Sequence, residues 1–577
     1  MGMHTNKAIW EAETEGLELL NLTIGELLDQ QAEAFADTEA LVYHYPEIGL
    51  NLRWTYRQYL DEANRLAKGL LALGIAKGEH IAMWATNVPE WALMQMAAAK
   101  IGAVLVTVNT NYRAAELEYV LRQGDVGTLV MIGNYRDNNF LDAVYAIAPE
   151  LSDVNDPVTE ALQCAKLPVL KRVVLIGDEA QPGLIPYAQM LALGESVSDE
   201  TLHARQANVT PHDLAQMQFT SGTTGFPKGV QMTHHGMVNN AWLTFGRMEV
   251  RAGDRYVTPM PFFHVAGSVL SLLGPVVTGT TLIPLIVFDP AKQLELMANE
   301  RGTHTVGVPT MLIAMLNHPR FQAGEFHLSA LRNVGSGGSP VPVTMMEQIH
   351  EQMGADVAIV YGMTETHCSI TFSLPHDPFA LKAGTVGVPI AHTSVKIAHP
   401  QTGEPVGFGE QGELCVRGFS PTQGYYKMPD KTAETIDAEG WLHSGDLATM
   451  NDKGYINIVG RVKEMVIRGG ENIFPAEIEA FLMRHPKVAE AQIVGVPDTF
   501  MGEELVALLR LKADEQADEA EIREYCRANI SRQKVPKYIR FVDAYPLTAS
   551  GKVQKFVLKE RLIKELGLED VAKLKMA

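Results

Sequence analysis

Short apolar runs alternate with longer amphipathic runs over the first 130 residues, and this alternation limits the fold more than any other feature of the chain. Thr23 followed by Glu26 is a capping-box pattern and predicts a helix over 22–35. The other predicted elements are helices over 55–73, 89–100 and 114–122 and strands over 81–85 and 103–108. Strands that alternate with helices form a parallel sheet with helices on its faces, so the sequence predicts an α/β fold.

The stretch from Thr220 to Gly229 packs hydroxyl side chains, glycines and one lysine into ten residues, directly after the apolar run 214–219. Glycines let the backbone approach a ligand closely, and backbone N–H groups, hydroxyls and the Lys228 ammonium can then bind a polyphosphate. The spacing differs from a P-loop, and Gly229 follows the lysine. The stretch predicts a phosphate-binding loop after a strand. The fragment 221–225 by itself fits an ordinary surface loop equally well.

The longer stretch from Gln218 to Gly236 resembles the phosphate-binding signature of the adenylate-forming superfamily, which includes acyl-CoA synthetases, luciferases and peptide-synthetase adenylation domains. The resemblance implies a large α/β N-terminal domain and a small mobile α+β C-terminal domain. It also implies that Thr220 and Lys228 serve catalysis. The loop residues that it assigns to ATP are Thr220, Ser221, Gly222, Thr223, Thr224, Gly225 and Lys228.

A second strong match to this superfamily covers residues 359–366. Tyr361 offers an aromatic face for adenine and Thr364 a hydroxyl for phosphate. The Glu365 carboxylate is a hard oxygen ligand of the kind Mg²⁺ prefers, although an isolated glutamate would be an ordinary surface residue. The resemblance implies that Glu365 and Thr220 hold Mg²⁺ and that Glu365 is catalytic. The further nucleotide contacts that it implies are Gly337, Gly338, Ser339, Tyr361, Gly362, Met363 and Thr364.

Two further positions match the superfamily's nucleotide contacts. Asp446 follows a turn, and its two carboxylate oxygens can accept hydrogen bonds from both ribose hydroxyls. Arg461 ends a predicted strand over 455–461. The resemblance implies that Asp446 binds the ribose and that Arg461 is a second ribose or phosphate contact.

The motif over 259–267 contains His264 beside two phenylalanines. A lone histidine beside aromatic residues is usually a core or loop residue, but the resemblance places this one in an acyl pocket. The pocket residues that it implies are His264, Val265, Gly267 and Gly335. Long-chain members carry a gating tryptophan just after this motif, whereas this chain has Gly267, Ser268 and Val269 there. The difference favours medium-chain or branched acids and leaves aryl acids open.

The composition shifts after Arg461, and the remaining residues predict a compact α+β module. Its predicted elements are helices over 475–484 and 519–529 and strands over 488–496, 505–511 and 538–542. The resemblance implies an N-terminal domain of residues 1–461 for ATP and the acid, and a C-terminal domain of residues 462–577. It makes Lys463 the hinge, and it places Lys552, on the loop 546–553, at the reacting carboxylate. Arg468, Gly469 and Gly470 would line the tunnel for the pantetheine arm of coenzyme A.

The overall composition limits the classes of binding partner and the cellular compartment that we expect for the chain. A net charge of −20 argues against a general nucleic-acid surface. The four cysteines, Cys164, Cys368, Cys415 and Cys526, form no CxxC pair, so they suggest neither a zinc site nor a disulfide framework, and a reducing cytoplasm fits. The first residues lack a signal-peptide core, and the last ones lack a peroxisomal address.

Residues 265–288 carry no charge and are long enough to cross a membrane. They also contain residues that interrupt an apolar helix, namely Gly267, Gly274, Pro275, Gly279 and Pro284. The stretch therefore predicts a buried helix followed by a strand, at most with a peripheral membrane contact. The sequence leaves open the possibility of a homodimer.

Together these features predict an ATP-dependent acid–CoA ligase of cytoplasmic fatty acid metabolism. A carboxylic acid and Mg·ATP would form acyl-AMP and pyrophosphate, and coenzyme A would then displace AMP. Three alternatives stay open. The enzyme could act on an aryl or other organic acid, or pass the acyl group to a carrier protein. The chain could also be a non-catalytic nucleotide-binding relative, although Lys552 and Glu365 are both present.

Overall fold

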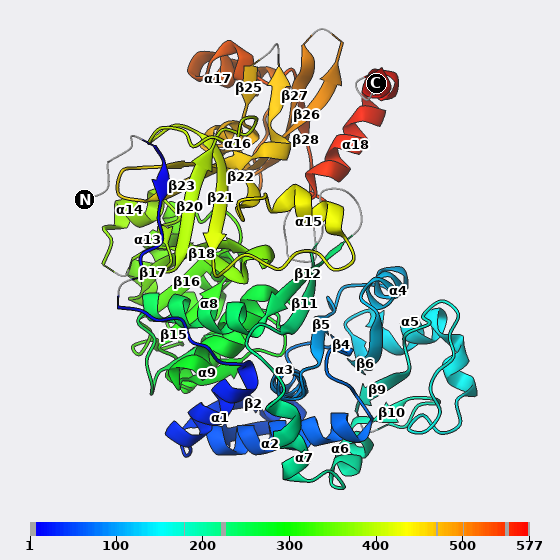
Figure 1. The fold of residues 1–577 in the computed structure, drawn as a ribbon. Helices are drawn as coiled ribbons and strands as arrows, with labels where there is room; N and C mark the ends of the chain where they lie inside the picture. Colours follow the sequence, from blue (N-terminus) through cyan, green and yellow to red (C-terminus); the bar gives the residue numbers. More distant parts are fainter. Residues whose placement is uncertain are drawn as a thin grey trace. The chain divides into compact units, whose positions relative to one another are not determined.

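The computed structural model describes residues 7–14, 16–177, 179–220, 227–374, 376–468, 471–499, 501–547 and 553–574. The chain forms two compact units. The large unit comprises Glu11–Ser394 and Val416–Leu442, and the small unit comprises Met1–Trp10, Val395–Cys415 and His443–Ala577. Figure 1 shows the course of the chain from blue to red. The units do not follow the domain boundary at 461/462, which stays a prediction.

The first sheet of the large unit has seven strands in the order β10-β9-β6-β4-β5-β11-β12. Neighbouring strands are parallel, except that β11 and β12 form an antiparallel hairpin. The strands are β4 (His80–Trp84), β5 (Val104–Thr107), β6 (Val126–Ile132), β9 (Arg172–Ile176), β10 (Ile185–Pro186), β11 (Leu214–Thr220) and β12 (Lys228–Thr233). The predicted parallel sheet is thus confirmed, and the candidate phosphate loop connects its last two strands.

The second sheet of the large unit has nine strands in the order β19-β18-β17-β16-β15-β13-β14-β2-β3. The strands from β17 to β2 run parallel, and antiparallel strands close both ends. The strands are β2 (Glu39–Tyr45), β3 (Leu50–Thr55), β13 (Arg255–Thr258), β14 (Thr281–Pro284), β15 (His304–Gly307), β16 (Asn333–Gly337), β17 (Asp356–Met363), β18 (Cys368–Phe372) and β19 (Val388–Pro389). A separate hairpin joins β7 (Asn134–Tyr135) and β8 (Asn138–Asn139).

The large unit also contains fifteen α-helices among its described residues. They are α1 (Ile24–Ala34), α2 (Tyr56–Ala72), α3 (Pro89–Ile101), α4 (Ala114–Gln123), α5 (Phe140–Ile147), α6 (Tyr187–Gly194), α7 (Asp199–Gln206), α8 (His234–Arg247), α9 (Gly274–Thr278), α10 (Pro290–Asn299), α11 (Pro309–Leu316), α12 (Pro319–Gln322), α13 (Val343–Gln348), α14 (Phe379–Gly384) and α15 (Pro429–Thr435). Helix α8 contacts β11 and β12 of the first sheet and β18 of the second. One apolar core therefore reaches from sheet to sheet across this helix.

Short helical turns complete the large unit. They are the 3₁₀ turns η1 (Pro46–Ile48), η2 (Pro149–Asp153) and η5 (Thr364–Thr366) and the π-helical segments η3 (Ala266–Leu273) and η4 (Ile349–Met353). The segment η3 is buried, and α9 and β14 follow it. The predicted buried helix and strand over 265–288 are thus confirmed. Among the described residues, no helix is long and apolar enough to span a bilayer.

The small unit contains two sheets. One has the order β1-β20-β21-β22-β23, with strands β1 (Ile9–Trp10), β20 (Thr393–Ala398), β21 (Gly412–Gly418), β22 (Leu442–Met450) and β23 (Ile456–Arg461). The other joins β25-β24-β27-β26, and β28 pairs with β27. Its strands are β24 (Val466–Arg468), β25 (Glu471–Ile473), β26 (Val488–Asp498), β27 (Gly502–Leu511) and β28 (Tyr538–Phe541).

The helical elements of the small unit are α16 (Pro475–Leu482), α17 (Glu519–Asn529), α18 (Lys555–Glu565), α19 (Glu569–Leu574), η6 (Val462–Glu464) and η7 (Arg532–Lys534). Apolar side chains of α16, α17 and strands β26 to β28 form its core. The five predicted elements of the α+β module are confirmed, and α17 has the predicted bounds. The sequence reasoning missed α18 and α19, as well as the short strands β24 and β25.

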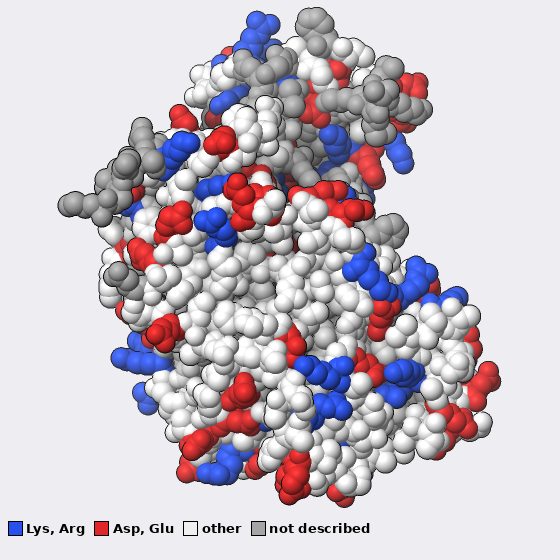
Figure 2. Space-filling view, in the orientation of Figure 1, with Lys and Arg blue, Asp and Glu red and all other residues white. Residues whose placement is uncertain are grey.

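Charged side chains of both signs are interspersed over the face of the molecule shown in Figure 2. The red carboxylates and blue lysine and arginine groups alternate over short distances there, and the formal net charge of the chain is −20. The described residues on this face therefore form no continuous basic surface of the kind that nucleic acids bind.

Helix α3 is buried almost all round, and its last turn carries a buried cation. The side chain of Lys100 is 2% exposed, and its ammonium lies 2.6 Å from Asp29 Oδ1 and 2.9 Å from Gln206 Oε1. Burial lowers the pKa of Lys100, and the Asp29 carboxylate opposes that effect. The Asp29 carboxylate thus compensates a charge that the helix brings into the core.

Asp29→Ala should therefore lower the melting temperature, because it leaves the Lys100 ammonium buried without its carboxylate. Breaking a buried pair is strongly destabilising, and since Asp29 is itself partly exposed we expect a loss of ~1–3 kcal/mol. Thermal unfolding monitored by circular dichroism measures it. The matched control is Asp199→Ala, which breaks the exposed pair with Lys68 and should leave the melting temperature unchanged. An equal effect of both variants would contradict the burial argument.

Candidate active site

The hairpin β11–β12 fixes the two ends of the candidate phosphate loop. Thr220 and Lys228 are register partners, and the Thr220 hydroxyl lies 3.5 Å from the Lys228 carbonyl oxygen. The predicted contacts Ser221, Gly222, Thr223, Thr224 and Gly225 lie outside the described residues. The loop therefore leaves and re-enters the sheet at one point, and both predicted catalytic residues of the hairpin stand at its mouth.

Tyr425 joins two predicted site residues that are far apart in the sequence. The Lys228 ammonium lies 3.9 Å from the centroid of the Tyr425 ring, and the Tyr425 hydroxyl donates a hydrogen bond to Glu365 Oε1 at 2.8 Å. Burial and the Glu365 carboxylate raise the pKa of Tyr425. The hydroxyl therefore stays protonated at neutral pH and remains a donor. Tyr425 thus makes a cation–π contact with its ring and donates a hydrogen bond with its hydroxyl.

The segment from Gly424 to Tyr426 is held along the outer edge of β12. The Gln231 N–H donates to the Gly424 carbonyl oxygen at 3.0 Å, and the Tyr426 N–H donates to the Gly229 carbonyl oxygen at 2.8 Å. Tyr425 thus faces the hairpin that carries Lys228 through strand pairing. Tyr425 was not selected from the sequence, since nothing local marks its partners.

Glu365 lies in the turn η5 directly after β17, and His367 fixes the chain behind it. His367 has a φ of 56°. Its Nε2 accepts the N–H of Thr233 at 3.1 Å, and its Nδ1 lies 2.7 Å from the Ser420 carbonyl oxygen. One nitrogen must accept and the other donate, which is the pattern of a neutral imidazole. Burial lowers the pKa of His367 to about 4, in agreement with that state.

The glycine-rich turn and Tyr361 lie on adjacent strands. Gly337 is the register partner of Val360, and a Cβ on Gly337 would lie 2.1 Å from the Val360 carbonyl oxygen. Gly338 then adopts a φ of 77°. A side chain at Gly337 would clash with the neighbouring backbone, and a side chain at Gly338 would be strained by the left-handed backbone conformation. The structure thus brings together the predicted nucleotide contacts of this turn, Gly337, Gly338 and Ser339, and those of β17, Tyr361, Gly362 and Met363.

The predicted acyl-pocket residue His264 is tied to the strand that ends in Thr220. The carbonyl oxygen of His264 accepts hydrogen bonds from Ser268, which lies in the π-helical segment η3. The Ser268 hydroxyl in turn accepts from Gln218 at 2.8 Å and from Gln216 at 2.9 Å, both on β11. π-Helical segments occur often at functional sites. This buried network holds the His264 turn in a fixed position relative to β11, the strand that ends in Thr220.

The other predicted pocket residues are buried. Gly267 contacts backbone, because a Cβ there would lie 1.9 Å from the Pro261 carbonyl oxygen. Gly335 has more room, since a Cβ would meet Met248 and Val306 at 3.5 Å. Val265 is 3% exposed. Their role in binding an acyl chain stays a prediction.

The remaining predicted site residues belong to the small unit. Asp446 and Arg461 are register partners on β22 and β23, and Arg461 Nε lies 2.8 Å from Asp446 Oδ1. Lys463 lies in the turn η6. Arg468 Nε lies 2.8 Å from Glu504 Oε2, and its guanidinium also donates to the carbonyl oxygens of Gln533 and Val535. Gly469, Gly470 and Lys552 lie outside the described residues.

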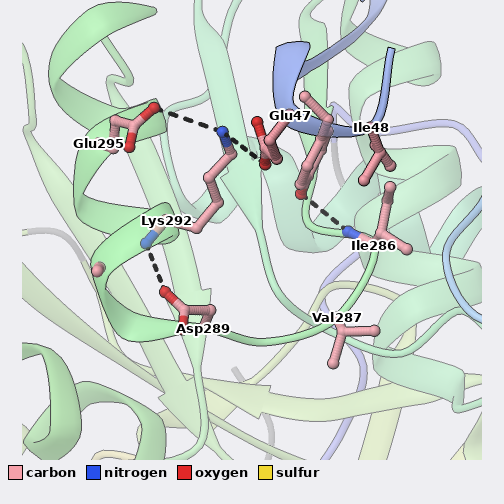
Figure 3. Close-up of a pocket in the computed structure, with 9 residues that line it drawn as sticks. Glu47, Ile48, Ile286, Val287, Asp289, Lys292 and Glu295 are labelled. Carbon is pink, nitrogen blue, oxygen red and sulfur yellow. Dashed lines mark hydrogen bonds and ion pairs between the residues drawn. The ribbon is translucent and has the colours of Figure 1, made fainter. Parts of the chain in front are cut away.

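A cavity of about 480 Å³ opens elsewhere in the large unit, beside the start of α10. Figure 3 shows Lys292 pointing toward Glu47 and Glu295, and its ammonium lies 3.4 Å from a carboxylate oxygen of each. The remaining lining residues are Tyr45, Ile48, Ile286, Val287, Asp289 and Ala291. No predicted ATP or acyl residue lines this cavity, so it is not the candidate active site.

Two family models match the chain. The model for the AMP-binding enzyme matches residues 28–426, and the model for the AMP-binding enzyme C-terminal domain matches residues 477–552. The chain belongs to the AMP-binding enzyme family. The first match contains Thr220, Lys228, Glu365 and Tyr425, and the second ends at Lys552. The predicted fold, a large N-terminal α/β domain with a small C-terminal domain, is confirmed.

Several members of the family resemble the chain over almost its whole length. YngI of Bacillus subtilis, provisionally named an acyl-CoA synthetase, is 44% identical over 96% of this chain and 99% of its own length. The mitochondrial medium-chain acyl-CoA ligase ACSF2 of Rattus norvegicus is 40% identical over 95% of this chain and 89% of its own length. The structure of the anthranilate CoA ligase AuaEII with anthranoyl-AMP has a TM-score of 0.81 and 25% identity, covering 96% and 99% of the two chains.

Tyr425→Phe should destabilise the large unit, because it keeps the ring under Lys228 but leaves the buried Glu365 carboxylate without this donor. A hydrogen bond to a charged group contributes ~1.5–3 kcal/mol, which sets the expected loss. Chemical denaturation measures it. Tyr426→Phe is the matched control, since its hydroxyl binds the Asp125 carboxylate at 2.9 Å at a less buried position. A loss in Tyr426→Phe as large as that in Tyr425→Phe would contradict the argument.

The neutral His367 predicts loss of stability in acid. Its pKa is about 4 in the folded chain against 6.5 as the ordinary value, so between these values the unfolded chain binds more protons. The contribution of neutral His367 to the free energy of unfolding is thus fully present above pH 6.5, and it is lost as the pH falls toward 4. His367→Gln offers an acceptor for Thr233 and a donor for Ser420 but does not titrate. The melting temperature of this variant should fall less than that of the wild type from pH 6.5 to 4. Equal falls would show that His367 does not titrate in this range.

Proposed function

We propose that the chain is an AMP-forming acid–CoA ligase. The observation that carries the proposal is similarity over nearly the whole chain to proteins named acyl-CoA synthetase and medium-chain acyl-CoA ligase. The match of both AMP-binding family models supports it. The contact between Lys228, Tyr425 and Glu365 supplies the local chemistry, a cation and a carboxylate held at the mouth of a glycine-rich loop.

In the first half-reaction, a carboxylate oxygen attacks the α-phosphorus of ATP. A new bond forms between the carboxylate oxygen and the α-phosphorus, and the bond from the α-phosphorus to the pyrophosphate oxygen breaks. The products are acyl-AMP and pyrophosphate. Both reactants are anions, so the chain must place positive charge around them. We assign Lys228 to the ATP phosphates and Lys552 to the reacting carboxylate. Removal of one such preorganised group costs ~3–4 kcal/mol of barrier.

The residues at the mouth of the loop fit Mg²⁺, because the Glu365 carboxylate and the Thr220 hydroxyl are hard oxygen ligands. Bound there, Mg²⁺ would neutralise charge on the ATP phosphates. Tyr425 holds the Glu365 carboxylate in place, and it keeps Lys228 beside the loop. Thr220 stands opposite Lys228 in the strand register. We propose that these four side chains surround the phosphates, and that Lys228 and Glu365 supply the charges.

The nucleoside is assigned to two sets of residues. We place adenine against Tyr361 and the turn Gly337–Ser339, with Gly362, Met363 and Thr364 beside it. We place the ribose on Asp446, with Arg461 as its partner. The ion pair between Asp446 and Arg461 supports this assignment, since Arg461 orients the carboxylate.

The second half-reaction requires the thiol of coenzyme A to displace AMP from acyl-AMP. We propose that the C-terminal domain, residues 462–577, rotates about Lys463 between the half-reactions, which withdraws Lys552. Lys463 lies in a short 3₁₀ turn after β23, and such element ends absorb backbone changes. Arg468, Gly469 and Gly470 would line the pantetheine path. Because Glu504 and two carbonyl oxygens engage the Arg468 guanidinium, its backbone is the more suitable contact.

For the acid, we propose a medium-chain fatty acid. The name of the mammalian relative and the small residues after His264 support this choice. An aryl acid is the second candidate, because a structural neighbour that covers nearly the whole chain is an anthranilate CoA ligase. Transfer of the acyl group to a carrier protein is the third reading, and dependence on free coenzyme A separates it from the other two.

The test is an assay of AMP, ADP and pyrophosphate with a panel of acids from C2 to C16 and benzoates. We expect AMP and pyrophosphate in amounts that depend on Mg²⁺, the acid and coenzyme A, with the highest kcat/KM near octanoate. Lys552→Ala should slow acyl-AMP formation by about 10²–10³-fold. It should still convert prepared acyl-AMP and coenzyme A to the thioester.

The matched control is Lys559→Ala, a lysine of α18 that pairs with Glu503 at 3.2 Å, and it should leave both half-reactions unchanged. Release of ADP would contradict the ligase proposal. A higher kcat/KM for acetate or for a benzoate than for octanoate would contradict the medium-chain assignment. Equal slowing of both half-reactions in Lys552→Ala would contradict its assigned role.

A further inference from the structure

A short segment of β22, from His443 to Gly445, is fastened to the neighbouring strand β21 by one carboxylate. Glu413 Oε2 lies 2.9 Å from His443 Nδ1, and Glu413 Oε1 accepts the N–H of Gly445 at 3.0 Å. The two strands are neighbours in the first sheet of the small unit and are labelled in Figure 1. The Glu413 side chain is 13% exposed, so these contacts are largely shielded from water. Glu413 thus holds the segment at two points.

The segment leads directly to Asp446. The Ser444 hydroxyl donates to the Leu414 carbonyl oxygen at 2.7 Å and accepts the N–H of Asp446 at 3.0 Å. Asp446 Oδ1 then lies 2.8 Å from Arg461 Nε on the other side. The direction of the Asp446 carboxylate therefore depends on the backbone course through the three preceding residues, and strand β21 sets that course.

Gly445 makes this course unusual for a strand. Its φ is 73°, in the left-handed region, and a Cβ there would have no heavy atom within 4 Å. The glycine is thus required by backbone conformation and not by lack of space. A glycine is also free to adopt other conformations, so its φ needs an external restraint. The hydrogen bond from its N–H to Glu413 is such a restraint.

We propose that Glu413 and His443 are positioning residues for the ribose of ATP. Glu413 holds Gly445 in its left-handed conformation, His443 holds Glu413, and together they aim Asp446 at the ribose hydroxyls. The inference rests on the proposed function, in which Asp446 binds the ribose. Neither residue touches the nucleotide in this arrangement, so the expected defect is in ATP binding and not in chemistry.

Cys415 is the third side chain of this cluster. Its sulfur lies 3.5 Å from His443 Nδ1, the same ring nitrogen that meets Glu413. A nucleophile relay uses the two different ring nitrogens, so the cluster is not built as a cysteine–histidine–glutamate triad.

The three candidate ligand atoms lie within 4.8 Å of one another, so zinc is the competing occupant. Cys415 and Glu413 raise the pKa of His443 to about 10, which makes the imidazolium the partner of Glu413 at neutral pH.

The experiment compares kcat/KM for ATP and for 2′,3′-dideoxy-ATP in acyl-AMP formation by the full-length protein. The ratio of the two values measures the ribose contact, and it is independent of the active fraction of a preparation. The variants are Glu413→Ala, Glu413→Gln, His443→Ala and Asp446→Ala. The matched control is Glu410→Ala, because Glu410 accepts the N–H of Gly407 at 2.8 Å, a partner in the same unit that lies outside the segment His443–Gly445.

The wild type should prefer ATP, and Asp446→Ala should abolish most of that preference. Glu413→Ala should reduce the preference about tenfold, the worth of one hydrogen bond to a charged group, mainly through a higher KM for ATP. The KM values for the acid and coenzyme A should stay within about twofold in the same variant. His443→Ala should show a smaller loss in the same direction. Glu413→Gln retains an oxygen for Gly445 and should keep more of the preference than Glu413→Ala, and Glu410→Ala should keep all of it.

Three results would overturn the inference. If Glu413→Ala keeps the full preference while Asp446→Ala loses it, the ribose assignment stands and the positioning role is wrong. If Asp446→Ala also keeps the preference, the ribose assignment itself fails, although AMP release would still support the ligase activity. Stoichiometric zinc that is lost in Cys415→Ala, and whose chelation reproduces the Glu413→Ala defect, would replace the positioning role with a metal site.

Discussion

The contact of Tyr425 with Lys228 and Glu365 is the interaction on which the candidate active site of the large unit depends. It joins the hairpin of the seven-stranded sheet to the end of β17 in the nine-stranded sheet. Neither sheet alone contains this arrangement, since Lys228 belongs to the first sheet and Glu365 follows a strand of the second. Because the tyrosine binds a cation with its ring and a carboxylate with its hydroxyl, it brings both charges to one place and offsets part of the cost of burying Glu365.

Buried hydrogen bonds also fix the backbone near the two carboxylates that we assign to ligands, Glu365 and Asp446. A neutral His367 fixes the chain after Glu365 through one accepted and one donated hydrogen bond. In the small unit, Glu413 fixes the chain before Asp446 through Gly445 and His443. Near each of these two carboxylates lies a residue with a positive φ, His367 two residues after Glu365 and Gly445 directly before Asp446. The His367 ring restrains its own residue, and the Glu413 side chain restrains Gly445. Such supports preorganise a site without contacting the substrate.

Much of this could be predicted from local sequence. The capping box at Thr23, the helix after Pro89 and the strand before Thr220 all appear where the pattern predicts them, because caps, prolines and apolar periodicity act over a few residues. Helix α18 was missed, since its buried apolar stripe is short and consists of Leu558 and Leu562. Tyr425, His367 and Glu413 were missed because their partners lie 30 or more residues away along the chain.

Residue type, order and spacing were enough to identify the family, the strand–helix alternation and the motifs at strand ends. The tertiary structure alone decided which charges meet. Tyr425 reaches Glu365 only because the segment 424–426 pairs with the edge of β12, and Glu413 reaches Gly445 only because β21 lies beside β22. Strand pairing between distant segments has no local signature, because the hydrogen-bonding groups of the backbone are the same in every residue except proline.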